Sequence, residues 1–291
     1  MTTGEPFYFG ISLIARDAAR SWDQVSTLFA ATLRSALSQT DSNVKVVLAA
    51  HDTPDCWDLL SRTDPRLTLL RADWPVKPPS PANDDAGAKK WRIKEYVSKC
   101  GGGLLMYLDA DDLVDVSTVE VARQLMGDEK PAGLVREGFA IDAMSGNALA
   151  IPDASAFNRP FHQLCGSTTV ARITPGEENA IDLLGSHHLW EERAEELRLN
   201  LAKLPLCGGY LVNSGENHSE NQGPFADWRR SFAQAVAQRG RRVSPRLVRQ
   251  LGVSGAEPWV SRDNLQRSGH AGDLNARPLR RHRSPKARDE E

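Results

Sequence analysis

Long hydrophobic runs are missing from this sequence. The longest apolar segment near the start, residues 7–15, falls well short of the ~20 residues that a membrane-spanning helix needs. No basic stretch precedes this segment and no cleavage site follows it, so we expect no signal peptide. Cysteine is also scarce: the four cysteines form no Cys-x-x-Cys pair, which argues against a disulfide framework and against a cysteine zinc site. These absences predict a cytoplasmic protein with reduced thiols.

A large net charge is absent too, but the charges are unevenly distributed. The whole chain has a formal net charge of −2, whereas residues 229–291 contain 15 Lys and Arg against 6 Asp and Glu. Two interpretations of this basic end are open. It is either a solvated terminus without a partner, or a tail that contacts an anionic surface and places the protein peripherally at the inner face of the membrane. We expect no nucleic-acid partner.

The overall composition, with 40% hydrophobic and 25% charged residues, is typical of a globular protein. In the first half of the chain, short apolar runs alternate with segments of helical periodicity. This alternation predicts a parallel sheet that is covered by helices. We expect strands at residues 7–14, 44–50, 67–70 and 104–108, and helices at residues 22–36, 56–60, 88–99 and 117–126.

The second half has a different pattern. Two apolar segments, residues 133–142 and 148–151, flank Ser145-Gly146-Asn147, which is typical of a hairpin. Beyond about residue 255 the chain is polar, and we expect little order there. A further strand is expected at residues 168–173, and helices are expected at 188–201 and 226–238.

Three aspartates follow the last apolar run of the first half. Asp109, Asp111 and Asp112 come directly after the expected fourth strand. In open α/β sheets ligands bind beyond the carboxyl ends of the strands, and carboxylates there can share Mg²⁺ with substrate phosphates. An EF-hand is excluded because Leu113 and Val114 stand where a ligand and a glycine are required. A plain acidic loop that caps the next helix stays open as the alternative.

The segment LLMYLDADDLV, residues 104–114, resembles the D-x-D segment of GT-A glycosyltransferases, especially those of family 2. Residues 9–37 resemble the first strand and helix of that family, and residues 44–55 resemble its second strand. The resemblance covers roughly residues 7–220. It implies an α/β fold of the GT-A (Rossmann-like) type, with a mostly parallel central sheet flanked by helices and a small antiparallel part on the acceptor side.

The resemblance also implies how the chain is divided. Residues 1–225 would form the glycosyltransferase domain, with a nucleotide-binding half at residues 1–115 and an acceptor half at residues 116–225. Residues 226–254 would form a helical extension, and residues 255–291 would form the basic tail.

For the nucleotide sugar, the resemblance points to groups in the first half of the chain. The backbone after the first strand would line the nucleotide pocket, Asp52 would accept a hydrogen bond from the base, and basic side chains would contact phosphate. Plain structural roles stay open: a turn residue for Asp52, a surface arginine for Arg71, and a solvated helix face for the later basic residues. The candidates for this site are Ile14, Ala15, Arg16, Asp52, Arg71, Lys90, Arg92 and Asp109.

The sequence departs from the family at the catalytic base. Family 2 enzymes usually place a carboxylate pair at the start of a helix near the acceptor, where one carboxylate removes the proton of the acceptor hydroxyl. The matching stretch here contains His187 and His188, followed by Glu191 and Glu192. A histidine can act as general base because its pKa lies near neutrality, so His188 is the first candidate. The alternative is that these histidines only begin a helix.

Asp109 and Asp111 are the candidate metal ligands in the D-x-D segment, and His218 is the candidate third ligand. Many GT-A enzymes supply one late histidine to the metal, and imidazole suits Mn²⁺ better than Mg²⁺. A solvent-exposed loop histidine is the alternative for His218. The expected cofactor is Mn²⁺ or Mg²⁺, which would neutralise charge on the departing diphosphate.

These features together predict a metal-dependent glycosyltransferase of the hexosyltransferase type. It would move a sugar from a nucleotide-diphosphate sugar to a saccharide or other hydroxyl acceptor, with inversion, as in polysaccharide biosynthesis. A nucleotidyltransferase is a second possibility, although residues 11–22 lack the glycine-rich loop that such enzymes place after the first strand. A third possibility is an inactive relative that binds nucleotide sugars without turnover.

Overall fold

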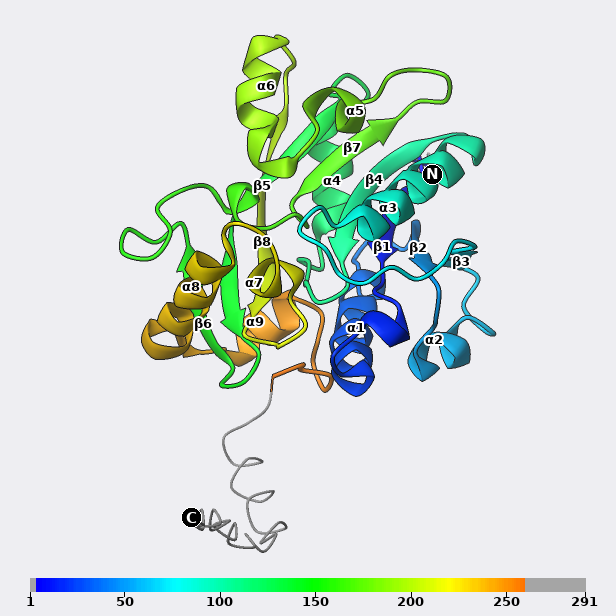
Figure 1. The fold of residues 1–291 in the computed structure, drawn as a ribbon. Helices are drawn as coiled ribbons and strands as arrows, with labels where there is room; N and C mark the ends of the chain where they lie inside the picture. Colours follow the sequence, from blue (N-terminus) through cyan, green and yellow to red (C-terminus); the bar gives the residue numbers. More distant parts are fainter. Residues whose placement is uncertain (1–3, 260–291) are drawn as a thin grey trace, which may run out of the picture. The chain divides into compact units, whose positions relative to one another are not determined.

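Four parallel strands form one half of the central sheet, as the alternation of strands and helices predicts (Figure 1). They stand in the order β3-β2-β1-β4 in the computed structural model, which describes residues 4–259. The strands are β1 (Phe7–Ser12), β2 (Val44–Ala50), β3 (Leu67–Arg71) and β4 (Gly103–Asp109), and the helices that connect them are α1 (Trp22–Leu37), α2 (Asp55–Leu60) and α3 (Asp84–Lys99).

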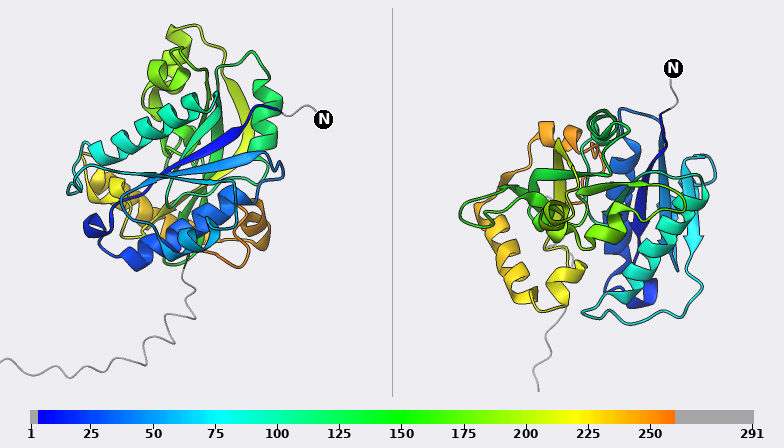
Figure 2. Two further views of the ribbon diagram at one scale, coloured as in Figure 1. Left: turned by 90° about the vertical axis from the view of Figure 1, so that its right-hand side faces the viewer. Right: turned by 90° about the horizontal axis from the view of Figure 1, so that it is seen from above.

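Helices cover both faces of this half of the sheet, which explains why its strands are apolar along most of their length. Successive side chains of β1 point to opposite faces. Phe9 and Ile11 belong to one core with Phe29 of α1, whereas Tyr8 belongs to a second core with Ile93 of α3. Figure 2 shows α1 and α3 on opposite sides of the sheet.

The second half of the sheet is centred on β5 (Ala132–Asp142). Antiparallel β7 (Thr169–Ile173) joins the two halves, because it pairs with β4 and with the start of β5. Strand β6 (Asn147–Ile151) forms the expected hairpin with β5, and β8 (Ala202–Val212) runs parallel to β5 along its other edge. The chain therefore has the expected α/β architecture, in which helices flank a sheet with a long parallel part and a smaller antiparallel part.

The helix expected over residues 188–201 is shorter than predicted. Only α6 (Trp190–Glu196) is α-helical in this stretch, and a 3₁₀ turn precedes it at His187–Leu189. Arg198 has a backbone φ of 57°, a left-handed conformation that ends a right-handed helix. The Glu- and Leu-rich pattern of this stretch therefore overestimates the length of the helix.

Strand β8 was missing from the expectations because its sequence contains Pro205 and a Gly-Gly pair, which usually argue against an interior strand. Pro205 lies where the register between β5 and β8 shifts, a position at which a proline costs no ladder hydrogen bond. At Gly208, a Cβ atom would lie 2.5 Å from the ring of Phe161, so the glycine permits close packing. Tertiary contacts thus create a strand that local propensity does not indicate.

The C-terminal part of the described chain packs onto the sheet. Strand β9 (Arg241–Arg242) pairs with β6, and Leu247, Leu251 and Val253 share a third core with Leu28 of α1. The basic tail lies outside the described residues from residue 260 on. Among residues 4–259, no helix has both the length and the apolar character of a membrane span. The remaining α-helices are α4 (Thr118–Met126), α5 (Ala180–Leu184), α7 (His218–Asn221), α8 (Ala226–Arg239) and α9 (Pro245–Gln250).

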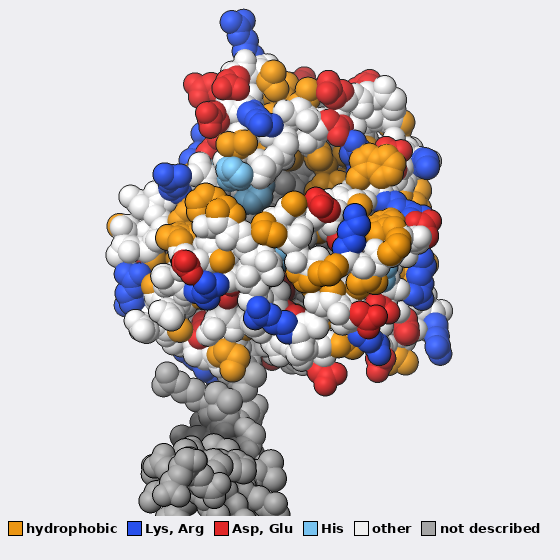
Figure 3. All heavy atoms as spheres, in the orientation of Figure 1, with side chains coloured by type: hydrophobic (Ala, Val, Ile, Leu, Met, Phe, Trp, Pro, Cys, Tyr) orange, Lys and Arg blue, Asp and Glu red, His pale blue; other side chains and the backbone are white. Residues whose placement is uncertain are grey.

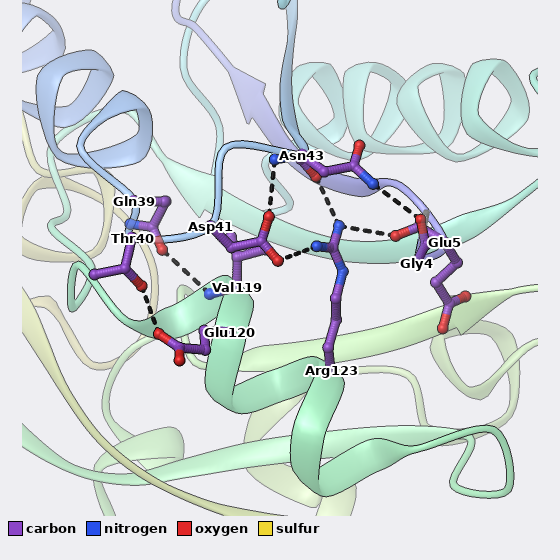
Figure 4. Close-up of polar contacts among 9 residues, drawn as sticks. All are labelled: Gly4, Glu5, Gln39, Thr40, Asp41, Asn43, Val119, Glu120 and Arg123. Carbon is purple, nitrogen blue, oxygen red and sulfur yellow. Dashed lines mark hydrogen bonds and ion pairs between the residues drawn. The ribbon is translucent and has the colours of Figure 1, made fainter. Parts of the chain in front are cut away.

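A polar cluster fastens α4 to the N-terminal ends of β1 and β2 (Figure 4). Arg123 of α4 forms an ion pair with Asp41 and donates hydrogen bonds to the carbonyl oxygens of Glu5 (2.8 Å) and Asn43 (2.7 Å). Because β1, β2 and β4 are parallel, this cluster lies at the opposite end of the sheet from the aspartates that follow β4. We therefore assign it a structural role.

Leu251→Ala should destabilise the protein by ~2–5 kcal/mol, the usual cost of truncating a buried leucine. The Leu251 side chain is fully buried, at 0% exposure. Urea unfolding measures the change, and Arg249→Ala, at an exposed position of α9, is the control. A cost below about 0.5 kcal/mol, as for a surface substitution, would show that this segment does not complete the core.

Candidate active site

A pocket of ≈ 620 Å³ opens at the carboxyl ends of β1 and β4. Residues 12–14 line it at the end of β1, and residues 109–112 line it at the end of β4. The side formed by the second half of the chain includes Gly166, His187 and residues 216–219. Figure 3 shows histidine side chains at the surface of the face that Figure 1 presents.

The three aspartates after β4 have different surroundings. Asp109 accepts a hydrogen bond from the Lys90 ammonium group, with 2.9 Å between Nζ and Oδ1. Asp112 is buried, and its Oδ2 accepts hydrogen bonds from Ser167 Oγ (2.6 Å) and Cys165 Sγ (3.2 Å). Its other oxygen, Oδ1, is buried without a hydrogen-bond partner among residues 4–259. Asp111, which lies between Asp109 and Asp112 in the sequence, also lines the pocket.

These carboxylates carry more negative charge than their surroundings neutralise. Burial and the charge of Asp109 raise the pKa of Asp112 to about 7, and burial and both neighbouring carboxylates raise the pKa of Asp111 well above its ordinary value. Burial opposes the charge of Asp109 as well, but the attraction and hydrogen bond of Lys90 hold the pKa of Asp109 below its usual range. A cation in the pocket would relieve this repulsion.

His187 faces the carboxylates. Its Nδ1–H group donates a hydrogen bond to the carbonyl oxygen of His162 at 2.5 Å, so the lone pair remains on Nε2. A Cβ atom on Gly166 would lie 3.2 Å from Oδ2 of Asp109 and 3.9 Å from Nε2 of His187, so both groups border the small space that this glycine leaves open. Burial lowers the pKa of His187 to about 4, so its imidazole is neutral near pH 7.

The other three candidate bases do not line the pocket. His188 is exposed, and its Nδ1 forms a hydrogen bond with Ser186 Oγ at 2.9 Å. Glu191 lies 3.3 Å from Arg136 Nη1 and 3.5 Å from His162 Nε2, and Glu192 is exposed. The order of the candidates therefore changes, because the structure brings His187 rather than His188 to the aspartates.

His218, the first residue of α7, lines the same pocket. Glu216 anchors the loop between β8 and α7, because its carboxylate accepts hydrogen bonds from the backbone N–H groups of Arg20 (3.1 Å) and Ser21 (2.6 Å) just before α1. Burial lowers the pKa of His218, against the attraction of Asp109. Within residues 4–259, however, no three His, Cys, Asp or Glu side chains lie close enough together to form a complete metal cluster.

The eight candidate nucleotide contacts are only partly brought together. Ile14, Lys90 and Asp109 line the pocket. Asp52 instead accepts a hydrogen bond from the backbone N–H of Arg16 at 2.9 Å, which holds the chain in place after β1. The remaining candidates lie away from the pocket lining: Ala15 is buried, Arg71 donates to the carbonyl of His51, and Arg92 pairs with Asp73.

Lys89 also lines the pocket, although the sequence indicated only its neighbour Lys90 as a candidate nucleotide contact. It is fully buried, at 0% exposure, and its ammonium group donates to Asp85 (2.5 Å) and to the carbonyl of Leu13 (2.6 Å). The available signal was the spacing of four residues between Asp85 and Lys89 on one helix, which places the two side chains on one face. Tyr210 and Arg229 also line the pocket, and no sequence motif marks them.

No protein-family model and no curated protein matches this sequence. Solved structures that resemble the chain in fold include residues 1–349 of S. aureus TarS in complex with UDP, with 12% sequence identity over 71% of this chain and a TM-score of 0.45. A structure of S. aureus TarS matches 89% of this chain with 13% identity and a TM-score of 0.43. Another is the apo structure of WbbM, a bifunctional glycosyltransferase, with 14% sequence identity over 70% of this chain and a TM-score of 0.38. This chain spans 60%, 44% and 39% of those chains, respectively. Likeness at this level assigns a role to no residue.

Proposed function

We propose that this chain is a glycosyltransferase that moves a sugar from a nucleoside diphosphate to a hydroxyl acceptor, with inversion. The observation that carries the proposal is that Asp109, Asp111 and His187 line one pocket together with residues 12–14 at the end of β1. Direct displacement requires a place for the diphosphate, compensation of its charge, and a base beside the acceptor. Each of these has a candidate in this pocket.

The donor would occupy the side of the pocket formed by β1 and α3. Lys89 fixes the backbone there, because its ammonium group is bound to the carbonyl of Leu13. Lys90 is the nearest cation to the aspartates and is only partly exposed. In the free protein it is paired with Asp109, and a diphosphate would offer it a second anionic partner.

A divalent cation fits the residues at this site. Asp109, Asp111 and Asp112 line one pocket in which Lys90 pairs with Asp109 alone, and Oδ1 of Asp112 has no partner among residues 4–259. Mg²⁺ is usually held by one or two carboxylates and by substrate phosphates, so a complete protein cluster is not required. We assign Asp109 and Asp111 as the oxygen ligands and His218 as the third, which favours Mn²⁺. The ion would offset charge on the departing diphosphate.

His187 is the proposed base. Its Nε2 borders the space left by Gly166 and is unprotonated near pH 7, so it can accept the proton of an acceptor hydroxyl, although the burial that lowers its pKa to about 4 also makes it a weaker base than an exposed imidazole. The acceptor oxygen then forms a bond to the anomeric carbon while the bond from that carbon to the diphosphate breaks. The hydrogen bond from Nδ1 to the carbonyl of His162 stabilises the imidazolium that results.

A nucleoside diphosphate should raise the melting temperature of the protein in the presence of Mn²⁺. At a hundredfold excess over Kd, ligand binding adds about 2.7 kcal/mol, which corresponds to about 5–10 °C for a domain of this size. A thermal-shift panel of UDP, GDP, CMP, dTDP and the nucleoside triphosphates UTP and GTP, with and without Mn²⁺, measures the effect.

The outcome of this panel decides between the functions. Stabilisation by a diphosphate, followed by release of that nucleotide from its sugar conjugate, supports transfer. Binding without any release indicates an inactive relative. Stabilisation by nucleoside triphosphates alone would favour a nucleotidyltransferase, and a panel without any shift would contradict the proposal.

A further inference from the structure

Arg229 of α8 presents its guanidinium group to the pocket in a fixed position. Its Nη1 donates hydrogen bonds to the carbonyl oxygen of Leu164 (2.9 Å) and to the hydroxyl of Tyr210 (3.4 Å). The guanidinium carbon also lies 5.8 Å from the ring centroid of Tyr210 and 5.3 Å from that of Trp228. Contacts of this kind with aromatic faces hold an arginine in place without neutralising its charge.

Within residues 4–259 no carboxylate forms a close ion pair with this guanidinium, although the attraction of Arg229 reaches the buried Glu220, where it opposes the rise in pKa that burial causes. Among residues 4–259, none of the ion pairs within 4.0 Å includes Arg229. The two lysines of the pocket are different, because Lys89 is paired with Asp85 at 2.5 Å and Lys90 with Asp109 at 2.9 Å. Arg229 is therefore a half-buried cation that lines the cavity and has no ion-pair partner within 4.0 Å among the described residues.

The neighbours of Arg229 place it in the acceptor half of the pocket. Leu164 lies between β6 and β7, Tyr210 belongs to β8, and α8 follows them in the chain. The proposed base, His187, comes from this half as well, whereas the donor side is built from β1 and α3. A ligand that is bound to Arg229 would thus occupy the same pocket as the proposed base and the proposed metal ligand His218.

We propose that Arg229 binds an anionic group of the acceptor, and that the acceptor is a phosphorylated or carboxylated saccharide. This inference rests on the proposed glycosyltransferase function. The planar fork of an arginine matches the oxygens of phosphate and carboxylate groups, and with one edge held by protein oxygens the rest of the fork is free for the ligand. A fixed cation that has no close ion-pair partner favours a charged acceptor, because a neutral sugar would leave the guanidinium without such a partner.

The donor also carries phosphate groups, so the experiment must separate the two sources. The preferred nucleoside diphosphate, chosen from the thermal-shift panel, is first added with Mn²⁺ to saturation. Glucose 6-phosphate, glucuronate and glucose are then titrated as probes by calorimetry. The variant is Arg229→Gln, and the matched control is Arg230→Gln. Arg230 belongs to the same helix, but its guanidinium pairs with Asp227 outside the pocket.

We expect the wild-type complex to bind glucose 6-phosphate or glucuronate about tenfold or more tightly than glucose, in line with charge-assisted hydrogen bonds. Arg229→Gln should remove this preference, and Arg230→Gln should retain it. The affinity of the protein for the nucleoside diphosphate should stay within about threefold in both variants, a difference below 1 kcal/mol. Arg229→Lys should recover only part of the preference, because it restores the charge without the fork.

Three results would overturn the inference. One is a wild-type complex that does not distinguish the anionic probes from glucose. Another is a tenfold loss of nucleotide affinity in Arg229→Gln, which would assign the guanidinium to the donor diphosphate. The third is an equal loss of anion binding in Arg230→Gln. If no nucleotide binds at all, the proposed function itself fails, and that result is distinct because it precedes the acceptor titration.

Discussion

Asp111→Asn should reduce sugar transfer by at least about 10³-fold, because a metal-bound carboxylate supports several kcal/mol of charge stabilisation in such a reaction. The substitution keeps the shape of the side chain and removes its charge. Burial and the charges of Asp112 and Asp109 already penalise that charge in the free protein, as the raised pKa of Asp111 indicates. The folded protein should therefore be as stable as wild type, or more stable.

Two measurements test this expectation together. Nucleotide release from the sugar donor gives the activity, and thermal unfolding without ligand gives the stability. Glu195→Gln, at an exposed position of α6, is the control for the loss of one negative charge. Wild-type activity in Asp111→Asn would remove the metal role of this residue. A lower melting temperature together with lost activity would instead indicate that Asp111 serves the fold.

His187→Ala should lower kcat by ~10²–10⁴-fold, the usual contribution of a general base, and should leave nucleotide affinity nearly unchanged. The reason is its position, since His187 borders the pocket beside Asp109 and His188 does not. His188→Ala is the matched control, because it removes the adjacent imidazole at an exposed position. If His188→Ala lowered kcat more than His187→Ala, His188 rather than His187 would be the candidate general base.

The pH profile provides a second test of His187. A general base must be neutral, so activity is lost when the pH falls through its pKa. Burial lowers the pKa of His187 to about 4. Asp111 and Asp112, whose pKa values are raised, titrate in the wild type and in His187→Ala alike, so the ratio of the two activities reports on His187. This ratio should stay level between about pH 8 and pH 6, whereas a base with the ordinary histidine pKa of ~6.5 would make it fall in that window. A fall in the ratio that is centred near pH 6.5 would contradict the role of a buried base.

The parallel half of the fold could be predicted because its information is local. A strand that is buried on both faces is apolar along most of its length, as in residues 44–50, where only Lys45 is polar, and a helix repeats its apolar positions over a few turns. The aspartates after residue 108 could be placed at the edge of the sheet for the same reason. Parallel strands end at one edge, so a cluster that follows such a strand faces the ligand side.

The second half depends on contacts between distant residues. Strand β8 contains Pro205, Gly208 and Gly209, and it becomes a strand because β5 pairs with it and Phe161 packs against Gly208. No local pattern in residues 202–212 records those partners, since they lie 40 residues or more away in the chain. The sequence therefore does not reveal how the strands of the second half of the chain are ordered.

The chemistry of the site divides in the same way. The sequence by itself determined that carboxylates follow β4 and that histidines stand near the start of α6. Only the tertiary structure decided that His187 lines the pocket while His188 is exposed, that Lys89 is buried, and that Arg229 forms no ion pair within 4.0 Å among the described residues. The physical reason is that burial, pKa and the availability of a charge depend on which side chains converge from separate elements, and neighbouring residues in a sequence can face opposite directions.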